Sequence, residues 1–122
     1  MAGSRQGRPG LGSRAPARGR FLRRLCFHTQ QAAEKALKSV YLHHRWTFRY
    51  IHDLEELITG LRQNGLAVPE DVEEAVILTS YAFEARHPAV GEPVGEEEYK
   101  QALGLAERVV RWADLLIEGT AP

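Results

Sequence analysis

Two short segments carry side chains that could transfer a proton or hold a phosphate group. His52 precedes Asp53 at the predicted start of a helix, and an imidazole beside a carboxylate can act as a general base. Asp at this position is commonly only a helix cap, however, and the structural role is the favoured interpretation of this pair. Farther along the chain, Arg86 and His87 precede Pro88, which disfavours helical backbone at the residue before it. We therefore expect both side chains at the C-terminal end of a helix.

The Arg86 segment itself allows two interpretations. A cation at the C-terminal end of a helix interacts favourably with the helix dipole, which would be a purely structural role. Alternatively, the planar guanidinium of Arg86 offers two parallel hydrogen bonds to a phosphate group. The sequence does not choose between these two roles.

Several other kinds of site are excluded by spacing. The five histidines form no HxxxH or HExxH pattern, so we expect no metal site, and no cofactor is expected either. Cys26 is the single cysteine, which rules out a disulfide framework and a CxxC redox pair, and we expect it to be a small buried apolar residue. Glycine-rich phosphate loops and a GxSxG nucleophile motif are absent.

The elements that must position these residues are predicted to be helices. Apolar residues recur at helical spacing through most of the chain after residue 20. The aromatic run of residues 45–51 is interpreted as a connection between helices, with Trp46, Phe48 and Ile51 packed on the bundle. Within the first helix, Glu34 and Lys38 form an i,i+4 pair. The fold class is therefore all-α, an up-and-down bundle of four or five helices. The expected helices span residues 20–44, from Leu54 to the Asn64-Gly65 stop with Asp53 and Glu56 as a capping box, from Pro69 to about Arg86, and from Glu96 to Gly119.

The charge of the chain is divided unevenly. The 122 residues sum to zero, but seven arginines and no acid stand in residues 1–24, so the rest carries −7. Residues 1–20 have too few large apolar side chains to fold and are expected to be a disordered tail. The predicted domain spans residues 21–118, with a short tail at 119–122. The basic tail by itself could bind nucleic acid weakly and with strong salt dependence.

The hydropathy of the chain bears on where it works. No apolar run approaches eighteen residues, so no membrane span is expected. The arginine-rich start also lacks the apolar stretch of a secretory signal. We expect a cytoplasmic protein.

Three motifs together resemble the HEPN domain family over about residues 25–118. They are Phe27-His-x-Gln-Gln-Ala-Ala-Glu-Lys-Ala-Leu-Lys38, then His52-Asp53-Leu54, then Tyr81-x4-Arg86-x-Pro88 ahead of a final apolar helix. The third motif departs from the more usual Arg-Tyr-Pro because His87 stands in the middle. This resemblance implies a helical bundle that is often a homodimer and is often encoded beside a minimal nucleotidyltransferase, as a toxin–antitoxin-like or nucleotide-handling pair.

The resemblance also implies a test for catalysis. Catalytic members of the family are metal-independent ribonucleases with an Arg-x4–6-His motif near the end of the bundle. Here the last histidine is His87, directly after Arg86, so that motif is missing. The pairs at this spacing, Arg23 with His28 and Arg45 with His52, lie in the N-terminal half. We therefore predict a non-catalytic module that binds nucleotide or nucleic-acid phosphate, and the alternative is a ribonuclease with an atypical Arg/His site.

The start of the chain departs from the family as well. Members usually have an amphipathic helix of about twenty residues ahead of the Phe-His-x-Gln-Gln segment, where this chain has its Gly/Arg-rich stretch. Either the helix is missing, which would leave an apolar groove and favour a dimer or a partner helix, or the start reads through non-native sequence.

Together these observations define the candidate residues. The expected ligand-binding residues are Arg86, His87, Tyr81, His52, Asp53 and Lys35. If the protein is an enzyme, the candidates for catalysis are His52, Arg86 and His87.

Overall fold

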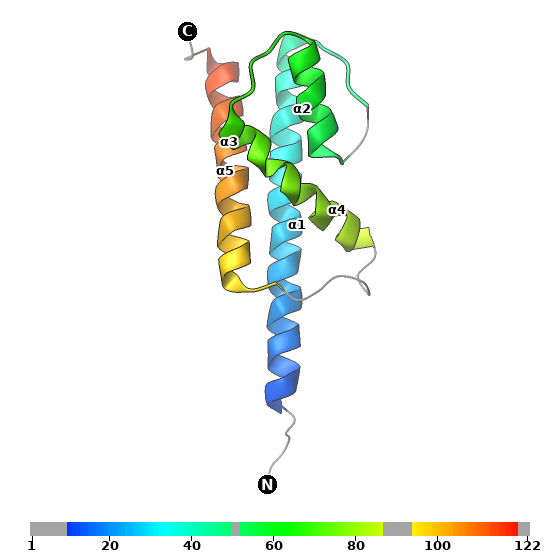
Figure 1. Cartoon of the computed structure of the whole chain (residues 1–122), viewed down its shortest axis with the longest axis vertical. Helices are drawn as coiled ribbons and strands as arrows, with labels where there is room; N and C mark the ends of the chain where they lie inside the picture. The colour runs from blue at the N-terminus through cyan, green and yellow to red at the C-terminus, as the bar shows by residue number, and fades with distance from the viewer. Residues whose placement is uncertain (1–9, 50–51, 87–93, 120–122) are drawn as a thin grey trace.

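The computed structural model of the chain describes residues 10–49, 52–86 and 94–119, and the side chains of 17–49, 52–82 and 94–119 among them. The described ranges contain helices and no strand, so the predicted all-α bundle is confirmed (Figure 1). The elements in chain order are α1 (Gly10–His44), α2 (Leu54–Gln63), α3 (Glu70–Glu73), the 3-10 helix η1 (Glu74–Leu78), α4 (Thr79–Arg86) and α5 (Glu96–Glu118).

Helix α1 begins earlier than the sequence indicates. Its first residue is Gly10 rather than about residue 20, so the expected disordered tail is wrong for residues 10–20, while residues 1–9 lie outside the described chain. The Gly19 carbonyl accepts a hydrogen bond from the Val94 N–H at 3.3 Å, and Arg18 forms an ion pair with Glu96. Contacts with the start of α5 thus support this part of α1, which its composition alone does not predict.

Helices α1, α2 and α5 run in the same direction (Figure 1). His52, just before α2, contacts Glu34, whereas the Tyr41 hydroxyl, two turns farther along α1, donates to the Leu57 carbonyl of α2 at 2.5 Å. The connection between the two helices must therefore lead the chain back along α1. Its aromatic and β-branched residues favour extended backbone, which covers about 3.3 Å per residue. The bundle consequently lacks the strict alternation of an up-and-down order.

The third predicted helix is divided into α3, η1 and α4. Its start is confirmed, since Pro69 is the N-cap of α3, and so is its end at Arg86. The middle tightens to 3-10 geometry because the buried side chains recur every three residues, and side chains three apart eclipse in a 3-10 helix. These buried residues are Val72, Ala75, Leu78 and Tyr81.

The core lies where α1, α2, η1 and α5 meet. Its fully buried side chains include Leu37 of α1, Leu57 of α2, Leu78 of η1 and Val109 of α5. Cys26 is fully buried as predicted. Trp46 and Phe48 pack against the core, which confirms their predicted role, and Ile51 lies outside the described residues. Helix α5 ends at Gly119 in left-handed backbone (φ 72°), as the sequence predicts.

Candidate functional site

Helix α1 carries three polar residues one turn apart on a face that packs against the rest of the bundle. Gln30 is fully buried, Glu34 is 7% exposed, and Lys38 lies one turn beyond. Because residues four apart on a helix lie above one another, the three side chains form a continuous polar line. The Lys38 Nζ donates to Glu34 Oε2 at 2.7 Å, and the Gln30 Nε2 donates to Glu34 Oε1 at 2.9 Å.

His52 is attached to this line through both its ring and its backbone. Its Nδ1 lies 2.9 Å from Glu34 Oε1 and 3.1 Å from Oε2, and its carbonyl accepts a hydrogen bond from Gln30 Nε2 at 3.2 Å. Two residues on neighbouring turns of α1 therefore fix the position of a residue in a connection. We call Gln30, Glu34, Lys38 and His52 the His52 site.

The electrostatics of the site keep Glu34 ionised. Burial raises the pKa of its carboxyl, but hydrogen bonds from Lys38, His52 and Gln30 outweigh burial and hold the pKa below its ordinary value. A carboxylate accepts only, so the His52 Nδ1 must carry the proton and donate it. The imidazole is half-exposed, and its Nε2 has no hydrogen-bond partner among the described residues. That nitrogen is free to exchange a proton with a ligand or, when protonated, to donate to a phosphate oxygen.

The buried amide of Gln30 also has an unpaired atom. Within the described chain its Oε1 has no hydrogen-bond partner. Rotating the amide would aim that oxygen at the Glu34 carboxylate and the His52 carbonyl, both acceptors, so the orientation is determined by its neighbours. An unpaired buried acceptor costs about 1–3 kcal/mol. The two bonds that Nε2 donates to the His52 site offset this cost.

Asp53 and Lys35, both predicted ligand-binding residues, are placed apart from the His52 imidazole. The Asp53 Oδ1 accepts from the Glu55 N–H at 3.0 Å and caps α2, so the structural interpretation of this residue is the observed one. The carboxylate beside His52 belongs to Glu34 instead. Lys35 is exposed and follows Glu34 on α1, and it forms no ion pair with a described residue.

Tyr81 is directed to α5 rather than to His52. Its hydroxyl donates to Glu98 Oε2 at 2.5 Å, and the side chain is 9% exposed. Burial, followed by the hydrogen bond to Glu98, raises the pKa of the phenol far above its ordinary value, so the hydroxyl keeps its proton. It forms no hydrogen bond or ring contact with His52. Tyr81 therefore holds α4 to α5 in the described structure.

The predicted phosphate ligands at the end of α4 are described only in part. Arg86 is the last residue of α4, as predicted, but its side chain and the whole of His87 lie outside the described residues. Helix α4 starts beside α2, because the Leu54 N–H donates to Thr79 Oγ1 at 3.0 Å. Arg86 therefore stands at the far end of a helix whose first residue contacts the start of α2.

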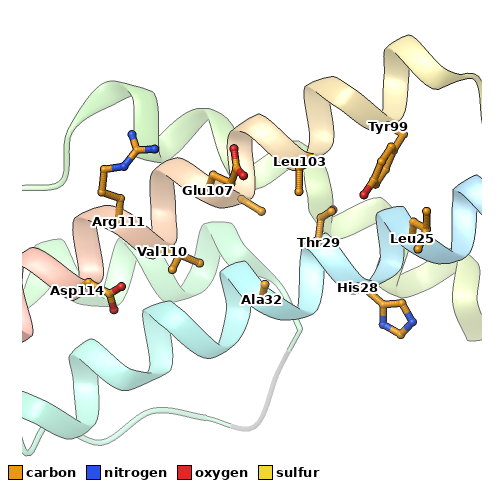
Figure 2. A pocket seen from close by; sticks show the side chains of 11 residues that line it. Leu25, His28, Thr29, Ala32, Tyr99, Leu103, Glu107, Val110, Arg111 and Asp114 are labelled. Carbon is orange, nitrogen blue, oxygen red and sulfur yellow. The ribbon is translucent and has the colours of Figure 1, made fainter.

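A groove of about 520 Å³ lies between α1 and α5, away from the His52 site (Figure 2). Leu25 and Ala32 of α1 and Leu103 and Val110 of α5 give it an apolar lining. Figure 2 shows these side chains between the two helices, with Glu107, Arg111 and Asp114 on the α5 side. The groove thus combines apolar lining with charges of both signs.

Among the described residues no three His, Cys, Asp or Glu side chains gather closely enough to hold a metal ion. In the same part of the chain, no helix has the length and apolarity needed to cross a membrane. The His52 site can supply a proton donor or acceptor and a contact for an anion.

The pairing of Glu34 with His52 was not predicted, although one signal was present. Gln30 and Glu34 fall within the apolar stripe of α1, between the buried Cys26 and Leu37. Polar residues in a buried stripe need hydrogen-bond partners. The sequence could thus have indicated a buried network, but not that His52 would complete it.

The described residues form a small all-α bundle in which a carboxylate holds a partly exposed imidazole. The family model of the HEPN domain matches residues 14–116, and the chain belongs to this family. The match begins within α1, in the stretch that the sequence alone indicated as disordered. A comparison with curated proteins found no match, and a comparison with solved structures found none either.

Proposed function

We propose that this HEPN domain is a non-catalytic module that binds the phosphate of a nucleotide or nucleic acid at the His52 site. The observation that carries the proposal is the half-exposed His52 side chain, whose Nδ1 is held by Glu34 and whose Nε2 forms no hydrogen bond with a described residue. In this proposal His52 and Arg86 contact the phosphate, with His87 beside them, whereas Lys35 lies apart from the imidazole and takes no part in the contact. Asp53 and Tyr81 support the site by capping α2 and anchoring α4.

The absence of the family's nuclease motif supports a binding role. No histidine follows Arg86 at the spacing that the catalytic members use, since His87 is the last histidine of the chain. A module without this motif can still hold a phosphate through a guanidinium and an imidazole. We further propose that it works in the cytoplasm.

NMR titration with ATP tests the binding site. We expect the His52 ring resonances and the Arg86 amide to shift together and to saturate, and His52→Ala to abolish the shift at Arg86. His43→Ala is the matched control, since His43 is an exposed histidine near the end of α1. No change at either residue with ATP or with a short RNA would overturn the proposed site.

We propose a minimal nucleotidyltransferase as the partner, in a toxin–antitoxin-like pair, because members of the HEPN family are often encoded beside one. Co-expression with the nucleotidyltransferase of a neighbouring gene, followed by gel filtration, tests this. A stable complex that co-elutes supports the pair. Separate elution at micromolar concentrations, or a neighbourhood without such a gene, argues against it.

We propose that a second copy of the chain occupies the α1–α5 groove. Leu103 is 37% exposed at the groove, and the rim offers Arg111 together with Glu107 and Asp114, which form no ion pair with a described residue. Because a twofold interface places the same helix against itself, Arg111 of each protomer can face an acid of its partner. Charge complementarity of this kind favours a homodimer.

Analytical ultracentrifugation tests this interface. Leu103→Glu should convert the dimer to a monomer because it buries an unpaired charge. Ile77→Glu on η1, where the side chain is 63% exposed, should leave the dimer intact. A wild-type chain that sediments as a monomer, or a dimer that tolerates Leu103→Glu, would contradict the proposed interface.

One observation favours the alternative, a metal-independent ribonuclease. A carboxylate that orients an imidazole through Nδ1 is an arrangement used for general acid–base catalysis. In that case the His52 Nε2 would accept the proton of an RNA 2′-hydroxyl while Arg86 holds the phosphate. Cleavage of RNA that is lost in His52→Ala or His87→Ala would establish it. Intact RNA, with and without the partner, would exclude it.

A further inference from the structure

The outward face of α1 carries a row of basic side chains. Arg20, Arg24, His28 and Lys35 are all exposed. At 3.6 residues per turn, they fall within about 80° of one another around the helix. His28 also lines the α1 side of the α1–α5 groove, where Figure 2 shows its ring. We call these four residues the cationic stripe.

We infer that the cationic stripe binds the phosphate backbone of a nucleic acid. This inference goes beyond the proposed function, because it needs neither the His52 site nor the end of α4. It also differs from binding by a disordered tail. Arg20 and Arg24 lie one turn apart because both are within α1, not in a disordered segment.

The charges of the stripe are not used inside the protein. Arg20, Arg24 and Lys35 form no ion pair with any described residue. On α1 the first acid is Glu34, which is buried and bound by Lys38, His52 and Gln30. Other acids stand at the starts of α3 and α5, and two of those on α5 have partners of their own, Glu96 with Arg18 and Glu98 with Tyr81. The stripe thus keeps a positive potential although the whole chain is neutral.

The length of the stripe matches a run of phosphates. Fifteen residues of helix separate Arg20 from Lys35, which is about 22 Å at 1.5 Å per residue. One strand of a duplex advances about 3.4 Å per phosphate, so the stripe spans roughly six phosphates. A mononucleotide is too short to reach from Arg20 to Lys35, so the length of the stripe favours a polymer.

Aromatic side chains accompany the stripe. Phe21 is 56% exposed next to Arg20, and the Phe27 ring contacts the His28 ring at 5.7 Å. Aromatic rings beside a basic groove or row stack with the bases of single strands. A membrane-surface helix would need a free apolar face, but the apolar face of α1 is buried in the core. These features favour nucleic acid, and single-stranded RNA in particular, over a lipid surface.

Fluorescence anisotropy with the full chain and a labelled single-stranded RNA of about twenty nucleotides tests the inference. The variant Arg20→Gln/Arg24→Gln/Lys35→Gln keeps good helix formers and removes three charges. We expect it to lose roughly tenfold or more in affinity, and the slope of log K against log salt to fall by about 2. Phe21→Ala should weaken single-strand binding more than duplex binding.

A control variant removes the same charge from other faces. Arg49→Gln/Lys100→Gln/Arg108→Gln alters three exposed cations in the connection after α1 and on α5, and it should leave affinity within about twofold. Equal losses in both variants would show only a net-charge effect and would overturn the inference. So would wild-type chain that binds vesicles of anionic lipid but not RNA.

The outcomes are separable from those of the His52 site. The stripe variant should still bind ATP with unchanged shifts at His52, while His52→Ala should still bind the RNA. If the wild-type chain binds RNA but shows no shifts with ATP, only the proposed function is overturned. If the stripe variant binds both ATP and RNA as the wild type does, only the stripe inference is overturned.

Discussion

The carboxylate that holds His52 comes from a residue eighteen positions earlier in the chain. Glu34 is bound by three donors on three sides, from Lys38, His52 and Gln30. Each bond favours the ionised carboxylate, and together they lower its pKa despite burial. Glu34 therefore links the stability of the fold to the geometry of the site.

Glu34→Gln should reduce stability in a pH-dependent way. The pKa of Glu34 is lower in the folded chain than its ordinary value of 4.5, so its contribution is fully present above about pH 4.5 and is lost as the pH falls through the folded pKa. At neutral pH we expect the free energy of unfolding to drop by roughly 1–3 kcal/mol. Urea unfolding of both chains from about pH 6 to about pH 3 should show this difference shrink toward zero.

Glu118→Gln provides the matched control. Glu118 is an exposed acid at the end of α5, and its substitution should change stability by less than about 0.5 kcal/mol at every pH. If the difference in the free energy of unfolding between wild type and Glu34→Gln stays constant down to the lowest pH, the hydrogen bonds to Glu34 do not lower the pKa of its carboxyl.

At the scale of elements, α1 and α2 approach each other closely at one glycine. The Tyr41 hydroxyl donates to the Leu57 carbonyl, and a Cβ on Gly60 would lie far inside van der Waals contact with the same hydroxyl. Gly60 is thus a packing requirement of the α1–α2 contact, and it lies in the middle of α2, where glycine is otherwise unfavourable. The sequence shows an unusual glycine inside a helix, but it does not show that Tyr41 is the residue that requires it.

Gly60→Ala should destabilise the protein by about 1–3 kcal/mol, because the added methyl group displaces Tyr41 and its hydrogen bond. Gly104→Ala on α5 should do the opposite. No atom lies within 4 Å of a Cβ there, so better helix propensity should raise stability by about 0.5–1 kcal/mol. Thermal unfolding of the two variants measures both signs. Destabilisation of equal size at both positions would contradict the packing argument.

At the scale of the whole molecule, the start of α1 is held by the start of α5. Figure 1 shows the N-terminal part of α1 extending beyond the start of α5, and the Gly19–Val94 hydrogen bond and the Arg18–Glu96 ion pair join the two helices at this level. Both ion-pair side chains are more than half exposed, so the pair itself contributes little. The backbone bond to the buried Val94 is the stronger connection.

Deletion of residues 1–20 should therefore lower the free energy of unfolding by about 1–2 kcal/mol, since it removes the acceptor for the Val94 N–H and shortens α1. Arg18→Gln should cost less than about 0.5 kcal/mol. Chemical denaturation of the two variants tests this order. A deletion that leaves stability unchanged would mean that residues 10–20 add nothing to the fold, as the sequence alone suggests.

Local signals predicted many of the element boundaries. Asp53 caps α2, Pro69 precedes α3, and Gly119 ends α5, because each depends on neighbours within one turn. The start of α1 and the 3-10 geometry of η1 were not predicted. The first depends on Val94 and the second on the spacing of side chains that pack against other helices.

The candidate site likewise combines residues that the sequence predicted with contacts that it did not. The sequence by itself determined that His52 is a chemically competent residue at a helix start, that Arg86 ends a helix, and that the chain has the motifs of a HEPN domain. Only the tertiary structure decided that Glu34, rather than the adjacent Asp53, holds the imidazole. Caps and helical periods are encoded within a few residues, whereas the partner of His52 depends on where a nine-residue connection returns the chain along α1.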